Sequence, residues 1–231
     1  MTGSVAVGNV ARDAWLVAAK DLRLEWRTRT ALTQVGPFVL AVLVLFGFAL
    51  DADRPTLERA TSGLFWVIVL FAAMLLIGRS SSIERDPGVA DALLLSGLSP
   101  AGIFLGKVVA LAVQLLVVEV VVGAGASVLY NITLVGWAVI VVTSLATTIA
   151  ISAIGALYGP VAGGAQTREA LLAVLILPTL APVLLAVTRA WEIAAGRGVG
   201  DAWAWAAMLG VSATIYLAVG AAVWGSLLSE P

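Results

Sequence analysis

The sequence predicts an all-α, polytopic membrane protein with six transmembrane helices, and two observations support this fold class. The 231 residues are 61% hydrophobic and only 12% charged, with a mean hydropathy of +1.06, whereas soluble domains carry about 25% charged residues. The apolar residues also gather in six stretches of the length that crosses about 30 Å of hydrocarbon. Residues 1–231 are therefore expected to form a single transmembrane domain.

Short polar connections separate the six predicted spans. The spans are Leu32–Leu50, Ser62–Gly78, Ile103–Tyr130, Leu134–Val161, Leu171–Arg189 and Trp203–Leu228. The first thirty residues carry dispersed charges rather than the basic start and clean apolar core of a secretory signal. We therefore expect the first span to remain in the mature protein.

The distribution of Lys and Arg predicts that both termini are cytoplasmic. Nine of the 13 basic residues fall on the side of the N-terminal segment, and four fall on the opposite side. Basic residues are enriched on the cytoplasmic side of membrane proteins. Tryptophans are expected at the headgroup level, and five of them mark the predicted outer ends of spans: Trp66, Trp137, Trp191, Trp203 and Trp205.

The chain contains no Cys and no His. The absence of Cys excludes disulfides and thiolate catalysis, and the absence of His removes the commonest metal ligand, the usual general base and the usual haem ligand. We therefore expect no catalytic residues, no metal site and no cofactor bound by this chain. A net charge of -1 gives no indication of nucleic-acid binding.

Residues 12–30 are expected to form an amphipathic elbow helix before the first span. One helical face is apolar and carries Trp15, Ala19, Leu22 and Trp26, while Arg23 and other basic residues lie mostly elsewhere. This pattern favours a helix in the inner leaflet. The helix either anchors the chain to the membrane surface or also contacts a cytoplasmic partner.

The longest polar connection, Arg79–Gly102, is expected in the cytoplasm, and residues 80–100 within it are a candidate docking loop. Pro87 can start a short helix and Gly88 permits a sharp turn. The candidate contact residues are Glu84, Arg85, Asp86, Gly88, Asp91, Leu94 and Leu95. A short charged helix with three leucines can dock into a groove of another protein, and the alternative is an interfacial turn without a partner.

Three features lie inside the predicted spans. Gln114 and Glu119 are polar residues of the third span, and Glu119 either belongs to a substrate path or makes an interhelical hydrogen bond. The four-residue spacing of the fourth-span glycines favours close helix packing: they are Gly155, Gly159 and Gly163. Pro178 and Pro182 kink the fifth span, as a hinge or as a static bend.

Four segments, in this order and spacing, carry a family resemblance. They are KDLRLEWRTR (Lys20–Arg29), LFWVIVLFAAMLLIGRS (Leu64–Ser80), ERDPGVADALLLSGLSPAGIFLGK (Glu84–Lys107) and LAVLILPTLAPVLLAVTRA (Leu172–Ala190). Over residues 12–228 the chain resembles the B component of the cytochrome c maturation system, also called haem exporter protein B. The resemblance implies a membrane subunit similar to type-2 ABC transporters in the bacterial inner membrane.

The resemblance also implies partners. The family works with an ATP-hydrolysing A component, a haem-handling C component and a small D component, in haem delivery and in ATP-dependent release of a haem-loaded chaperone. ATP and haem would therefore be bound by partner subunits, and a second copy of the chain is a further candidate partner. The resemblance makes residues 80–100 the expected contact with the ATPase, although Pro87 stands where many relatives have an acid.

Two other functions remain open at this point. A permease of the same architecture would move another small amphiphile, and a membrane scaffold would transport nothing. An enzyme is not expected, because the sequence holds no catalytic constellation.

Overall fold

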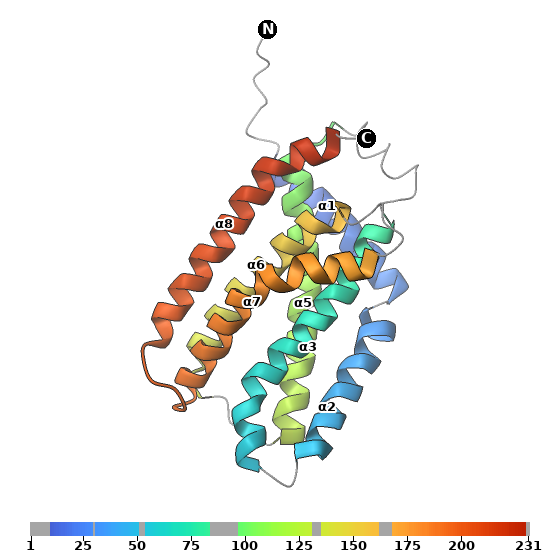
Figure 1. The fold of residues 1–231 in the computed structure, drawn as a ribbon. Helices are drawn as coiled ribbons and strands as arrows, with labels where there is room; N and C mark the ends of the chain where they lie inside the picture. Colours follow the sequence, from blue (N-terminus) through green and yellow to red (C-terminus); the bar gives the residue numbers. More distant parts are fainter. Residues whose placement is uncertain are drawn as a thin grey trace.

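The computed structural model describes residues 10–29, 31–50, 54–83, 97–130, 135–161 and 168–229, and within these ranges the regular structure is helical throughout. The elements are α1 (Val10–Thr28), the π-helical turn η1 (Ala31–Val35), α2 (Gly36–Leu50), α3 (Arg54–Ile83), α5 (Pro100–Tyr130), α6 (Trp137–Val161), α7 (Arg168–Ala194) and α8 (Ala202–Ser229). Figure 1 shows them as a bundle of long helices, with α1 crossing near one end.

Five of the helices are long and apolar enough to cross a membrane: α3, α5, α6, α7 and α8. The chain is therefore a multi-pass membrane protein, as predicted. The apolar part of the first predicted span covers Thr33–Ala49, so it is shorter than the other five. Five of the six predicted spans thus have a helix of membrane-spanning length, and the count of six stays a prediction.

Helices α3 and α7 extend beyond the spans predicted from hydropathy. The second predicted span began at Ser62 and ended at Gly78, whereas α3 runs from Arg54 to Ile83. The fifth began at Leu171, whereas α7 starts at Arg168 and continues to Ala194. Hydropathy marks the segment that lipid solvates, and backbone hydrogen bonding continues past it into polar residues.

The central helices of the bundle are α5 and α6. α5 packs on α1, α2, α3, α6 and α8, and α6 packs on α3, α5, α7 and α8. Gly155 of α6 lies against Ile77 of α3, where an added Cβ would come within 2.7 Å of Cγ1. Gly159 is buried, and Gly163 lies outside the described residues.

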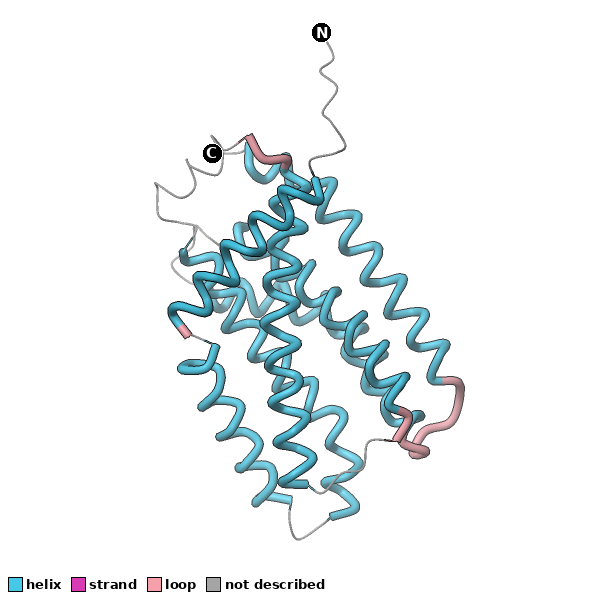
Figure 2. The backbone as a smooth tube through the Cα atoms, turned by 180° about the vertical axis from the view of Figure 1, so that it is seen from behind, coloured by secondary structure: helices cyan, strands magenta, loops and turns pink. Residues whose placement is uncertain are grey.

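The two ends of the bundle can be identified from contacts. At the α1 end, Asp13 of α1 contacts Ser99 just before α5, and Gly225 of α8 lies beside Pro100. At the opposite end, Tyr130 of α5 reaches α2. The view from behind in Figure 2 shows the same arrangement, with the start of α1 and the end of α8 at one end.

The tryptophans of the opposite end do not all face the surface. Trp137 and Trp203 are exposed, as expected for the headgroup level, but Trp66 is only 1% exposed. Trp66 packs edge-on against Trp191, with ring centroids 5.5 Å apart, and both contact Phe65. Trp66 is therefore covered by neighbouring helices, because this indole fills the space between α3 and α7.

Candidate functional site at the α1–α5 junction

The start of α5 is a well-formed helix cap. Gly97 adopts a positive φ of 67°, and Ser99 accepts a hydrogen bond from the N–H of Gly102 at 3.3 Å through Oγ. Pro100 then occupies the first helical position, where its missing N–H has no consequence. The direction of α5 is thus set immediately after residues 84–96, which lie outside the described residues.

Asp13 fastens α1 to this cap. Oδ2 of Asp13 accepts hydrogen bonds from the backbone N–H of Ser99 at 3.0 Å and from its hydroxyl at 2.9 Å. The carboxylate is buried and lies at the positive end of the α5 dipole, which favours a negative charge. The first helix is therefore joined directly to the residue that starts α5.

Two glycines let α1 approach the backbone of α5. A Cβ added to Gly102 would lie 2.6 Å from Cβ of Asp13, and one added to Gly106 would lie 2.6 Å from both the Ala14 carbonyl oxygen and Cβ of Val17. Such separations are too short for any side chain. Small residues one turn apart are how helices pack closely in membranes, so the junction requires glycine at both positions.

A buried lysine follows the second glycine. Lys107 is only 5% exposed, and the charges that act on it are an attraction from Asp21 and a weaker repulsion from Lys20. Lys20 and Asp21 form an ion pair of 2.9 Å with each other. The junction therefore combines a buried carboxylate, a buried ammonium and two glycine contacts between the same two helices.

The apolar face predicted for the elbow helix points away from this junction. Trp15 is 71% exposed and Trp26 is 85% exposed, Arg23 is exposed and Leu22 is half-buried. The side that packs on α5 carries Asp13, Val17 and Ala18 instead. α1 therefore has one side fitted to the bundle and a second, tryptophan-bearing side that the bundle leaves uncovered.

The predicted docking residues cannot be placed relative to this junction. Residues 84–96, and with them Glu84, Arg85, Asp86, Gly88, Asp91, Leu94 and Leu95, lie outside the described residues. The described chain resumes at Gly97, two residues before Ser99. The junction is thus the part of the structure that adjoins the predicted docking loop in the chain.

The intramembrane polar residues lie elsewhere. Glu119 is 13 residues beyond Gly106, about 20 Å along α5, and accepts a hydrogen bond at Oε1 from the Thr148 hydroxyl of α6. Both side chains are buried, whereas Gln114 is half-buried. Of the two interpretations of Glu119, a substrate path or an interhelical hydrogen bond, the structure shows the hydrogen bond.

Sequence reasoning missed five residues of the junction: Asp13, Ser99, Gly102, Gly106 and Lys107. The signals were present, because Ser-Pro before an apolar run is a helix start and the two glycines are four residues apart. These sequence signals became informative only when the structure showed that α1 packs on Ser99 and on the two glycines. Among the described residues no group of three or more His, Cys, Asp or Glu side chains gathers.

Comparison with known proteins places the chain in a family. A profile described as "CcmB protein" matches residues 12–226, which include the whole junction. The heme exporter protein B of Haemophilus influenzae is 27% identical over 178 residues, 77% of this chain and 80% of the relative. That of Bradyrhizobium diazoefficiens is 28% identical over 170 residues, 72% of this chain and 75% of the relative. The chain belongs to the CcmB protein family.

Proposed function

We propose that this chain is the membrane subunit of a haem export and cytochrome c maturation complex. The observation that carries the proposal is the family match over residues 12–226, supported by two relatives named heme exporter protein B. The complex would supply ATP hydrolysis through a separate A component and haem handling through C and D components. The chain itself would bind neither ATP nor haem.

The role of this subunit in the complex is to couple the ATPase to the membrane helices. Residues 84–96 dock on the ATPase, and the α1–α5 junction passes their displacement to the bundle. Two contacts support this: the Asp13–Ser99 hydrogen bonds and the close approach at Gly106. Because both contacts join α1 to the first turns of α5, α1 and the start of α5 move as one body.

The chain spans the bacterial inner membrane six times, with both termini in the cytoplasm. The first of these spans is the helical run Ala31–Leu50, formed by η1 and α2. Its support is the contact with α5, where the Tyr130 hydroxyl donates to the Leu43 carbonyl at 2.8 Å and Gly125 receives the Leu43 side chain. The tryptophan-bearing side of α1 lies in the inner leaflet, where indoles are favourable.

The deciding experiment replaces Gly88 by Trp in the native host. We expect the ATP-hydrolysing subunit to be lost on purification, together with covalently haem-stained c-type cytochromes. Gly210→Trp is the matched control, because nothing lies within 4 Å of an added Cβ at that position. Normal recovery of the ATPase with normal cytochromes in Gly88→Trp would refute the coupling role.

Removal of the whole chain tests the substrate class separately. We expect every c-type cytochrome to disappear and to return when the natural chain is supplied. Retention of these cytochromes in the deletion strain would instead favour a permease for another amphiphile, or a scaffold.

A further inference from the structure

Helix α7 changes direction near its middle. Figure 1 shows its two halves running along different lines, and Pro178 and Pro182 lie inside the helix, one turn apart. Neither proline has an N–H, so the carbonyls of Val174 and Pro178 lose their α-helical donors. The bend therefore lies where the backbone hydrogen-bond ladder is interrupted twice.

Tyr216 of α8 is hydrogen-bonded to the backbone between the two prolines. Its hydroxyl donates to the carbonyl oxygen of Thr179 at 3.1 Å. The Thr179 hydroxyl donates in turn to the Leu175 carbonyl at 2.9 Å, on the N-terminal side of the bend. Thr179 thus connects the Tyr216 side chain of α8 with the half of α7 that precedes the prolines.

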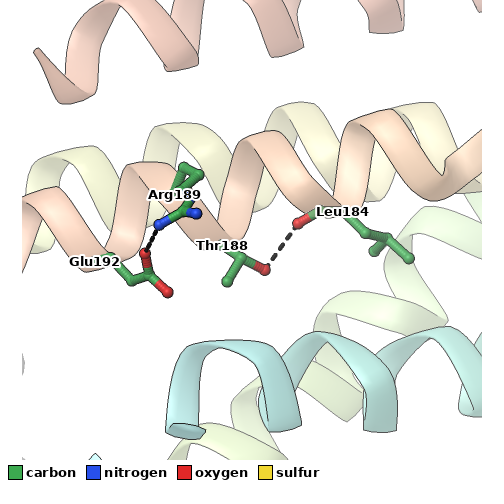
Figure 3. A network of polar contacts seen from close by, with 4 residues as sticks. All are labelled: Leu184, Thr188, Arg189 and Glu192. Atoms are coloured by element: carbon green, nitrogen blue, oxygen red, sulfur yellow. Dashed lines mark hydrogen bonds and ion pairs between the residues drawn. The ribbon is translucent and has the colours of Figure 1, made fainter. Parts of the chain in front are cut away.

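The C-terminal half of α7 is anchored to the bundle. Val183, Ala186, Val187 and Ala190 are all buried, and the Trp191 indole N–H donates to Thr143 of α6 at 3.0 Å. Figure 3 shows further contacts of this half within the helix, where Thr188 donates to the Leu184 carbonyl at 2.8 Å and Arg189 pairs with Glu192 at 2.9 Å.

In the N-terminal half, side chains are described from Ala173 to Leu177, and within this stretch Ile176 is the one that is buried. Val174 and Leu177 are exposed, while Ile176 is buried against the bundle. The two halves therefore differ in what holds them, and the Tyr216 hydroxyl acts at the point where they meet.

From this asymmetry we propose that α7 is a hinged helix. The segment Arg168–Leu177 moves about Pro178–Pro182, while Val183–Ala194 stays fixed on α3 and α6. The hydrogen bond from Tyr216 to the Thr179 carbonyl is the latch that holds the bent position. The inference does not depend on the proposed function, since the bend and the latch can be measured on the full-length chain in a lipid bilayer.

The absence of cysteine from the natural chain permits a direct test by spin labelling. A first pair of cysteines, at Val174 and Val128, reports the distance between the movable half of α7 and α5. A second pair, at Leu185 and Val128, reports the distance between the fixed half and α5. All three positions are exposed. Distances are measured by double electron–electron resonance on the full-length chain in lipid nanodiscs.

The test variant is Tyr216→Phe, which removes only the hydroxyl. A change of about 20° at the hinge moves Val174, about 9 Å from it along the helix, by about 3 Å. We therefore expect the Val174–Val128 distribution to broaden or shift by about 3 Å, with the Leu185–Val128 distribution unchanged. Thr214→Val removes a hydroxyl that donates within α8 to the Gly210 carbonyl, and it is expected to change neither pair.

A second variant addresses the prolines themselves. Pro182→Ala restores a backbone donor, and we expect it to move the Val174–Val128 distance to a new, narrow distribution. The proposal is overturned if Tyr216→Phe leaves the Val174 pair unchanged. It is equally overturned if both pairs change together, because that would show loosening of the whole helix rather than movement at a hinge.

Discussion

Asp13 and Ser99 are 86 residues apart in the chain, yet one carboxylate oxygen of Asp13 accepts both the N–H and the hydroxyl hydrogen of Ser99. This pair joins the first helix of the protein to the cap of its central helix. The contact has consequences that can be measured.

Replacing Asp13 by Ala is expected to destabilise the protein by about 1–3 kcal/mol, because two partly buried donors of Ser99 lose a charged acceptor. The measurement is thermal unfolding of the purified chain in detergent. Glu58→Ala removes an exposed carboxylate of α3 and serves as control, with an expected change within about 0.5 kcal/mol. Equal melting temperatures for the two variants would contradict the role assigned to Asp13.

Replacing Gly106 by Val is expected to detach α1 from α5. The new side chain would overlap the Ala14 carbonyl and Val17, so α1 must move away. Hydrogen exchange in nanodiscs should then show faster exchange of the α1 amides while α6 stays protected. In Gly210→Val, at a position with open surroundings, α1 should exchange as in the natural chain, and faster exchange there would argue against a specific contact.

The hydrogen bond between Glu119 and Thr148 should appear as a coupling energy in a double-mutant cycle. Glu119→Gln retains an acceptor for the Thr148 hydroxyl, whereas Glu119→Leu does not. Interhelical hydrogen bonds in membranes contribute about 0.6 kcal/mol on average, so we expect about 0.5–2 kcal/mol for Glu119→Leu combined with Thr148→Val.

The control for this cycle pairs Glu119→Leu with Thr188→Val, since the Thr188 hydroxyl donates within its own helix. We expect no coupling there. A Glu119→Gln variant that is as stable as the natural chain but fails to support c-type cytochromes would instead restore the interpretation as a substrate path.

The number of spans can be decided by labelling single cysteines in intact cells, since the natural chain has none. If α2 crosses the membrane, a cysteine in residues 51–53 reacts with an impermeant maleimide from outside. A cysteine at the exposed Val199, between α7 and α8, does the same. A cysteine at Gly163 reacts only after the cells are opened. Protection of residues 51–53 in intact cells would mean that α2 does not cross.

Much of the fold was predictable because it depends on local composition. The apolar stretch Ile103–Tyr130 predicted α5 to within three residues at its start, since about 20 apolar residues suffice to make a lipid-spanning helix. The ends of α3 were not predictable in this way, because Arg54 and Ile83 lie beyond the apolar stretch.

Local stretches of residues were enough to identify a helical, multi-pass membrane protein of the family it resembles, because solvation by lipid and family motifs are both properties of such stretches. The packed helices were needed to show which side of α1 meets the bundle, that Gly102 and Gly106 receive it, and that Thr148 is the partner of Glu119. These contacts join residues that are far apart in the chain. Helical periodicity predicts which residues share a face of a helix, but it does not predict which other helix that face contacts.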